Sequence, residues 1–279
     1  MKGKRVVITG ASRGIGRETA KAIGKMGADL VLVVRDEGRG KQTAEEVRAE
    51  GGGGEVEVVV GDLSSLADVH QVADTIVKKH DRIDVLLNNA GAIIMDRTIT
   101  KDGYEATFAT NHLAYHLLTK RLLDTLKKAP EPRVVNVSSE FHRRGTIKFD
   151  DLMGERNWSA LRAYAASKLA NILFTTELAR RLEGTNVTTN SLHPGAIGSN
   201  FGVSNGGVVG FLWKLAGPFL MNEKDGAKTS IYLATDPNVK VTGKYFEKCK
   251  ERKPSREARN TDIAKKLWDV SEDLISKVG

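Results

Sequence analysis

Short uninterrupted runs of aliphatic residues recur along this chain, separated by segments with helical character. Continuous runs, in contrast to alternating ones, are typical of strands buried on both faces of a parallel sheet. Helices between such strands form right-handed crossovers and cover both faces of the sheet. The sequence therefore predicts an α/β protein with a doubly wound parallel sheet. The runs are RVVIT (5–9), DLVLVV (29–34), VEVVV (56–60), VLLNN (85–89), RVVNVSS (133–139), VTTNSL (187–192) and a further candidate, GKYFE, near 243.

The chain contains no linker, internal repeat or low-complexity segment that would divide it. Of its 279 residues, 40% are hydrophobic and 28% are charged, which is ordinary for a globular protein. A glycine run at 51–54 predicts a turn or loop inside the domain. We therefore predict one domain over 1–279.

The single cysteine, Cys249, excludes an internal disulfide and fits a reducing compartment. The N-terminal MKGKRVVITG has neither the apolar core of a signal peptide nor the length of a spanning helix. The longest apolar run, 206–221, is interrupted by Lys214, Gly217 and Pro218. We expect a cytoplasmic protein without a transmembrane segment, and peripheral contact with a membrane stays open.

The formal net charge is +8, but the basic residues are scattered through the sequence and form no single block. Aromatic residues make up 6% of the chain and do not interleave with the basic ones, as a surface for single-stranded nucleic acid would require. We interpret the basic residues as solvated faces and predict no nucleic-acid partner and no metal site.

A glycine-rich turn, TGASRGIG at 9–16, lies between the first predicted strand and the first predicted helix. Glycines at this point allow a tight turn and let phosphate oxygens approach the amides at the helix N-terminus. This placement indicates a Rossmann-type dinucleotide site, although a merely tight turn is the alternative. The expected cofactor contacts are Gly10, Ser12, Arg13, Gly14, Ile15 and Gly16.

The end of the second strand discriminates between the two nicotinamide cofactors. An acid there would bind the ribose hydroxyls of NAD and repel a 2′-phosphate, but Val34 occupies that place and Arg35 follows it. Arg35 and Arg13 can both bind a phosphate, which favours NADP(H) over NAD(H). If Asp36 turned inward in place of Arg35, that preference would weaken.

Two later strand ends add expected cofactor contacts. Asp62, in GDL, can accept a hydrogen bond from the adenine amino group, and the small residues of NNAG at 88–91 leave a floor for a ribose. Asn89 could alternatively be only a turn former. The contacts expected here are Asp62, Leu63, Asn89, Ala90 and Gly91.

Tyr164 lies four residues before Lys168 in AYAASKLANILF, which has helical character. Residues i and i+4 share a helical face, so the phenol and the ammonium can point into one pocket. Taken alone, the pair fits the edge of a packed helix equally well.

In chain order, TGASRGIG, NNAG, Asn111, NVSS with Ser139, and YAASK with Tyr164 and Lys168 together resemble the short-chain dehydrogenase/reductase (SDR) family. The resemblance extends over essentially the whole chain and implies hydride transfer between a nicotinamide and a carbonyl or alcohol. It assigns the proton transfer to Tyr164, and binding of the nicotinamide ribose to Lys168.

The resemblance also gives roles to the polar residues around that pair. The Lys168 ammonium would lower the pKa of Tyr164, and Ser139 would donate to the substrate oxygen. Ser138 is the rival, and the family pattern favours the second serine. Asn111 would hold a water linking Lys168 to solvent, with a helix-bending polar residue as the alternative.

The turn HPG at 193–195 passes the nicotinamide in this family, which implies contacts from Pro194, Gly195 and the Ile197 amide, with Ser199 as a further candidate. We interpret His193 as a turn residue without a role in proton transfer.

The segment between Ser139 and Tyr164, together with SKLANILFTTELARRL, is similar to the retinol dehydrogenase-like branch, which implies lipophilic aldehydes, ketones and alcohols as substrates. Membrane-bound members carry an N-terminal anchor that this sequence does not show. The segment 196–222 falls where the family has its substrate loop. Its apolar residues would line the pocket or form a lid; they are Phe201, Phe211, Leu212, Trp213 and Phe219.

Two other functions stay open at this point: a non-catalytic NADP(H) sensor, and a basic protein that binds nucleic acid or membrane surfaces. The resemblance also implies a homodimer or homotetramer, paired through the helices around Asn111 and Tyr164.

Overall fold

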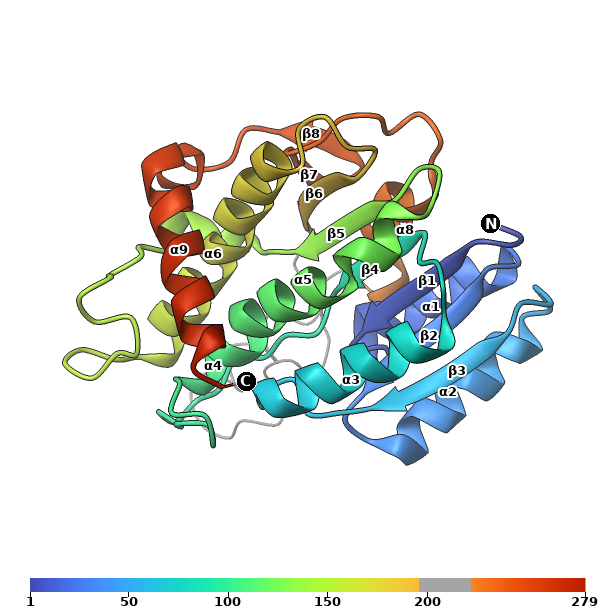
Figure 1. The fold of residues 1–279 in the computed structure, drawn as a ribbon, viewed down its shortest axis with the longest axis horizontal. Coiled ribbons are helices and arrows are strands. Elements are labelled where there is room, and N and C mark those ends of the chain that lie inside the picture. The colour runs from blue at the N-terminus through green and yellow to red at the C-terminus, as the bar shows by residue number, and fades with distance from the viewer. Residues whose placement is uncertain (196–221, 279) are drawn as a thin grey trace.

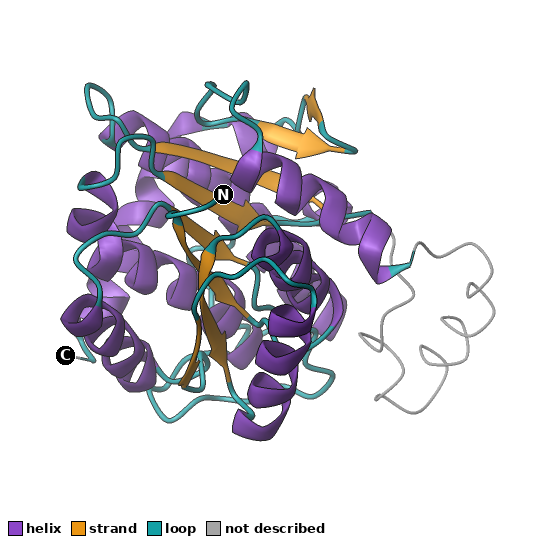
Figure 2. Ribbon diagram, turned by 90° about the vertical axis from the view of Figure 1, so that its right-hand side faces the viewer, coloured by secondary structure: helices purple, strands orange, loops and turns teal. Residues whose placement is uncertain are grey.

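The computed structural model describes residues 1–195 and 222–278. One eight-stranded sheet runs through it in the order β3-β2-β1-β4-β5-β6-β7-β8, with helices on both sides (Figures 1 and 2). The first seven strands are parallel, and β8 is antiparallel to β7. The strands are β1 (Arg5–Thr9), β2 (Asp29–Val34), β3 (Val56–Val60), β4 (Val85–Asn88), β5 (Arg133–Val137), β6 (Thr188–His193), β7 (Tyr245–Glu247) and β8 (Lys250–Arg252).

The sequence prediction of a doubly wound parallel α/β sheet is confirmed. Successive residues of a strand point to opposite faces, so Val6 and Ile8 join one hydrophobic cluster while Val7 joins the other. One face is covered by α3, α5 and α6, and the other by α1, α2 and α8. The helices are α1 (Gly14–Lys25), α2 (Glu37–Ala49), α3 (Leu66–Lys79), α4 (Ala106–Phe108), α5 (Ala114–Lys127), α6 (Ala160–Arg181), α8 (Glu223–Thr235) and α9 (Thr261–Ser276).

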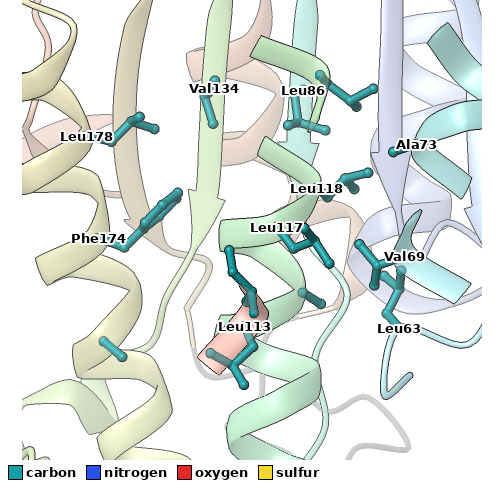
Figure 3. Close-up of a cluster of buried hydrophobic side chains, with 14 of the residues drawn as sticks. Leu63, Val69, Ala73, Leu86, Leu113, Leu117, Leu118, Val134, Phe174 and Leu178 are labelled. Atoms are coloured by element: carbon teal, nitrogen blue, oxygen red, sulfur yellow. The ribbon is translucent and has the colours of Figure 1, made fainter. Parts of the chain in front are cut away.

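The larger cluster forms where α3, α5 and α6 pack on the middle of the sheet. Figure 3 shows Leu117 and Leu118 of α5 in the middle of the cluster, near Leu86 of β4, with Phe174 of α6 on one side and Val69 of α3 on the other. The final helix, α9, lies across α6 (Figure 1), where the ring of Trp268 stacks on Phe174 at 5.6 Å. Because α6 is covered on several sides, its buried residues include Tyr164, Ser167 and Lys168.

Three strand ends differ from the prediction, since β6 ends at His193, one residue later than predicted. β4 ends at Asn88 and β5 at Val137, so Asn89, Ser138 and Ser139 follow their strands. β8 was not predicted, because its charged and exposed residues give no hydrophobic signal at the sheet edge. No helix of the described residues is long and apolar enough to cross a bilayer.

The two-residue turn between β7 and β8 stores backbone strain. Lys248 and Cys249 both have positive φ, 51° and 57°, and strands paired at Glu247 and Lys250 enclose them. Such type I′ turns favour Asn-Gly, because side chains other than Asn, Asp and Gly rarely adopt this conformation. We expect Lys248→Asn with Cys249→Gly to stabilise the protein by about 1 kcal/mol. Urea denaturation of both proteins measures this change, and an unchanged or lower midpoint would contradict it.

Candidate active site

The carboxyl ends of the parallel strands meet at one edge of the sheet, where β1 and β4 lie side by side although they are far apart in sequence. This switch point is where doubly wound sheets bind ligands. The glycine turn follows β1, NNAG follows β4, Ser139 follows β5 and the HPG turn follows β6. Because α6 packs beside β5 and β6, Tyr164 and Lys168 come to the same edge.

Lys168 is buried and extends from α6 toward the end of β5. Its ammonium donates to the Val137 carbonyl at 3.0 Å and lies 5.7 and 5.9 Å from the ring centres of Tyr164 and Tyr115. A Cβ on Gly91 would stand 3.1 Å from Nζ, so the missing side chain leaves the approach to the ammonium open. Burial lowers the pKa of Lys168 to about 7, because the charged form loses its hydration.

Tyr164 is also buried, and burial raises the pKa of its phenol to about 12, while a hydrogen bond with Ser139 acts in the opposite direction. The expected lowering of the Tyr164 pKa by Lys168 is therefore wrong. The physical reason is that desolvation opposes charge on both groups, so it disfavours phenolate and ammonium together.

The two serines after β5 point to different places. The Ser138 hydroxyl donates to the Lys168 carbonyl at 2.7 Å, so this serine anchors α6 to the strand. The Ser139 hydroxyl oxygen accepts from the Phe141 amide at 3.2 Å and pairs with Tyr164. A hydroxyl that accepts through a lone pair still has its O–H to donate. The Ser139 hydroxyl can therefore donate to Tyr164 or to a substrate oxygen bound beside Tyr164.

Asn111 lies in a π-helical turn over Ala109–Leu113, an irregularity that is frequent at functional sites. Its Nδ2 donates to the Ala92 carbonyl at 3.0 Å and to Ser167 Oγ at 2.9 Å, and its Oδ1 accepts from the Ala92 amide at 2.8 Å. The side chain therefore clamps the segment after NNAG to α6. The predicted water beside Asn111 stays a prediction.

The sequence reasoning missed three supporting residues. The Tyr115 hydroxyl donates to the Ala90 carbonyl at 2.7 Å, Asn171 Nδ2 shares the Val137 carbonyl with Lys168 at 3.1 Å, and the Ser167 hydroxyl donates to the Tyr164 carbonyl at 2.8 Å. Helical spacing could have revealed two of them. Tyr115 lies four residues after Asn111 and Asn171 lies three residues after Lys168, so each shares a helical face with a predicted site residue.

The glycine turn has the shape of a phosphate cradle. Gly10 has φ 65°, and a Cβ there would stand 2.8 Å from Ala90 Cα. A Cβ on Gly16 would stand 2.3 Å from the Gly10 carbonyl oxygen. The Arg13 side chain makes no capping hydrogen bond at the N-terminus of α1, where the first helix amides favour an anion. The Glu223 carboxylate lies nearby, since a Cβ on Gly14 would stand 3.7 Å from Glu223 Oε1.

The NNAG segment braces this cradle from β4. Asn89 Nδ2 donates to the carbonyls of Thr9 and Gly10 at 2.8 and 3.3 Å, and the Thr9 hydroxyl accepts from the amides of Asn89 and Ala90 at 2.9 Å each. Asn89 is thus more than a turn former, because its amide fixes the turn after β1.

The predicted adenine contacts lie after β3. Asp62 Oδ1 accepts from the Ser64 amide at 2.9 Å, which fixes the carboxylate. The Leu63 side chain is buried in the hydrophobic core, so any contact of Leu63 with a ligand has to use its main chain.

At the end of β2, Val34 is buried and Arg35 is exposed. Asp36 caps α2, since its Oδ1 accepts from the Arg39 amide at 2.9 Å. Arg13, just before α1, is exposed as well. The Arg13 and Arg35 side chains are thus both exposed, and the Asp36 carboxylate is held at the N-terminus of α2.

Pro194 and Gly195 follow β6 at the same edge, and Gly195 has φ 100°. His193 is half-buried, and desolvation lowers its pKa. Ile197, Ser199 and the predicted lid over 196–222 lie outside the described residues, except for Asn222, whose side chain caps α8.

Comparisons with known proteins agree with this geometry. Residues 4–206 match the family model described as short chain dehydrogenase. The chain is 42% identical to retinol dehydrogenase 14 of Mus musculus, over 99% of this chain and 86% of that protein. A crystal structure of a putative uncharacterized protein from Mycobacterium paratuberculosis superposes with a TM-score of 0.81 at 32% identity, covering 99% of this chain and 94% of that one.

A second solved structure is a putative short chain dehydrogenase from Shigella flexneri in complex with NADP. Its TM-score is 0.73 at 25% identity, and the match covers 90% of this chain and 98% of that one. The site, the family match and these similarities lead to one conclusion: the chain belongs to the short chain dehydrogenase family, is an oxidoreductase similar to the retinol dehydrogenases, and has the fold that binds NAD(P).

Proposed function

We propose that this protein interconverts a lipophilic aldehyde or ketone and its alcohol with NADP(H), and that Tyr164 transfers the proton. The observation that carries the proposal is the convergence of Ser139, Tyr164 and Lys168 at the edge of the sheet beside the small residue Gly91. The glycine cradle and the helix amides at the N-terminus of α1 fit the phosphates of a dinucleotide.

Each residue has a distinct task in the proposed reaction. A bound nicotinamide supplies or accepts the hydride at the carbonyl carbon. Ser139 orients the substrate oxygen by donating a hydrogen bond to it. Tyr164 is protonated at neutral pH, because its pKa is about 12, so it can give its proton to the alkoxide that forms. The Lys168 ammonium stabilises the resulting phenolate and, by family resemblance, also binds the nicotinamide ribose.

A screen of aldehydes and ketones with NADPH and NADH, followed at the nicotinamide absorbance, tests this function. We expect apolar carbonyls to be reduced and small polar ones to be poor substrates. If no member of the panel is reduced while NADPH binds tightly, the sensor hypothesis replaces the enzyme.

The preference for NADP(H) rests on Arg35 and Arg13, and on Asp36 being held at the N-terminus of α2. We expect Arg35→Ala to lower kcat/KM for NADPH about 10- to 100-fold, because a charge-assisted hydrogen bond to the 2′-phosphate contributes about 1.5–3 kcal/mol. The value for NADH should change little. Steady-state kinetics with both cofactors measures the ratio, and an equal loss with both would contradict the assignment.

The third hypothesis, a basic surface-binding protein, finds little support in the described residues. Lys120 and Arg121 pair with Glu272 and Asp74, and Arg143 pairs with Glu140. A steep loss of binding to DNA or anionic vesicles with salt would support that hypothesis. Cytoplasmic location and a homodimer or homotetramer remain proposals. The predicted pairing uses the helix around Tyr164, which is α6, and α9 of the same chain packs on part of that helix.

A further inference from the structure

His142 contacts the main chain of Ser139, a residue of the proposed proton-transfer site. It belongs to the short 3₁₀ turn Glu140–Arg144 that follows Ser139, and its side chain is completely buried. Its Nδ1 lies 2.7 Å from the Ser139 carbonyl oxygen. Its Nε2 lies 3.2 Å from the amide nitrogen of Ser255, which is far along the chain.

These two partners fix where the imidazole carries its hydrogen. A backbone amide can only donate, so Nε2 must accept from Ser255; a carbonyl can only accept, so Nδ1 must carry the hydrogen and donate to Ser139. The neutral ring thereby satisfies both nitrogens. Burial lowers the pKa of His142, which keeps the ring in this form.

The hydrogen bond from Nδ1 acts on the main chain of Ser139. The Ser139 carbonyl also accepts from the His142 amide at 3.1 Å, so two donors from one residue hold this peptide group. Within the same turn, the Phe141 amide donates to the Ser139 hydroxyl oxygen. The direction in which Ser139 donates is therefore set by the geometry of a turn that His142 closes.

We propose that His142 is a positioning residue for the oxidoreductase reaction: it couples the segment after β8 to Ser139 and holds the serine hydroxyl in register with Tyr164. The proposal rests on the proposed function of Ser139. A second contact reinforces the coupling, since Arg143 Nη2 donates to the Lys253 carbonyl at 3.2 Å. Ser255 is itself anchored, because its hydroxyl accepts from the Ala258 amide at 3.2 Å.

The opposing interpretation is that His142 only fills space, since its ring packs against Tyr245 at 5.0 Å. Two substitutions of similar polarity separate the interpretations. The amide nitrogen of His142→Asn can stand in for Nδ1 and keep the donor to Ser139. The longer His142→Gln places its amide near Nε2, so it keeps an acceptor for Ser255 and loses the donor to Ser139.

We expect His142→Gln to lower kcat for carbonyl reduction about 10- to 100-fold, because small displacements of a reacting group are costly, while KM for NADPH stays near the parent value. His142→Asn should recover most of kcat. His116→Gln is the matched control, because this other buried histidine pairs with Glu272 on α9; it should leave kcat unchanged. Equal losses of kcat in the Asn and Gln variants, or a loss in the control as large as in His142→Gln, would overturn the proposal.

Amide hydrogen exchange of the peptide over residues 138–145 supplies a readout that needs no turnover. We expect faster exchange in His142→Gln and near-parental exchange in His142→Asn. Parental exchange in both variants would overturn the role of His142 even if the enzyme is active. If the parent protein reduces no carbonyl at all, the proposed function fails, and the exchange result still decides whether His142 holds the Ser139 turn.

Discussion

Replacing Tyr164 with phenylalanine is expected to lower kcat about 10²- to 10⁴-fold, the range that general acid catalysis contributes. The phenol is the one acidic hydroxyl of the predicted catalytic set, and it is protonated at neutral pH because burial raises its pKa to about 12. Phenylalanine keeps the ring and the packing against Phe141 at 5.9 Å. The measurement is kcat with the best carbonyl of the panel, together with NADPH affinity from cofactor fluorescence, which should stay near the parent value.

Tyr104→Phe is the matched control for this substitution. Tyr104 is also buried, but its hydroxyl donates to the Leu274 carbonyl of α9, away from the strand ends that form the site. We expect Tyr104→Phe to keep kcat and to lose about 1 kcal/mol of stability with that hydrogen bond. If Tyr164→Phe turns over at the parental rate, Tyr164 is not the proton donor, and the proposed mechanism is wrong.

The parts of the fold that sequence predicted well are those governed by local patterns. β1 and β2 coincide with RVVIT and DLVLVV because strands buried on both faces need continuous aliphatic residues. The i, i+4 spacing also put Tyr164 and Lys168 on one face of α6. The short strand β8 gave no such pattern, because its three residues are charged and exposed.

The electrostatics of the site could not be derived from spacing. A lysine one turn from a tyrosine predicts an acidified phenol, yet the pKa of Tyr164 is raised. The burial of Tyr164 and Lys168 depends on how α6, the 3₁₀ turn Glu140–Arg144 and the NNAG segment pack together. These segments come from distant parts of the sequence. The role of His142 was hidden for the same reason, since Ser255 reaches it only through the folded β7–β8 hairpin and the segment that follows.

Lys168→Met should stabilise the protein while it lowers turnover, because the lysine is retained at a cost to folding. Nζ is buried with one backbone acceptor, the Val137 carbonyl, and burial lowers the pKa of Lys168 from 10.5 to about 7. Methionine fills a similar volume without a charge to desolvate. We expect a gain of about 2–4 kcal/mol at pH 6, after about 1 kcal/mol is subtracted for the lost hydrogen bond.

The pH dependence gives this prediction its sign. Between pH 7 and 10.5 the unfolded chain binds a proton on Lys168 that the folded chain does not, so the parent gains stability as the pH rises through this window. Above pH 10.5, Lys168 is neutral in both the folded and the unfolded chain. There the Lys168→Met variant differs in stability from the parent mainly by the lost hydrogen bond to Val137. Urea denaturation at pH 6, 8 and 10 should therefore show the advantage of Lys168→Met shrinking with pH. Lys127→Met, whose side chain is 43% exposed, should show no such trend; a pH-independent difference for Lys168→Met would mean that the ammonium is held charged in the folded protein.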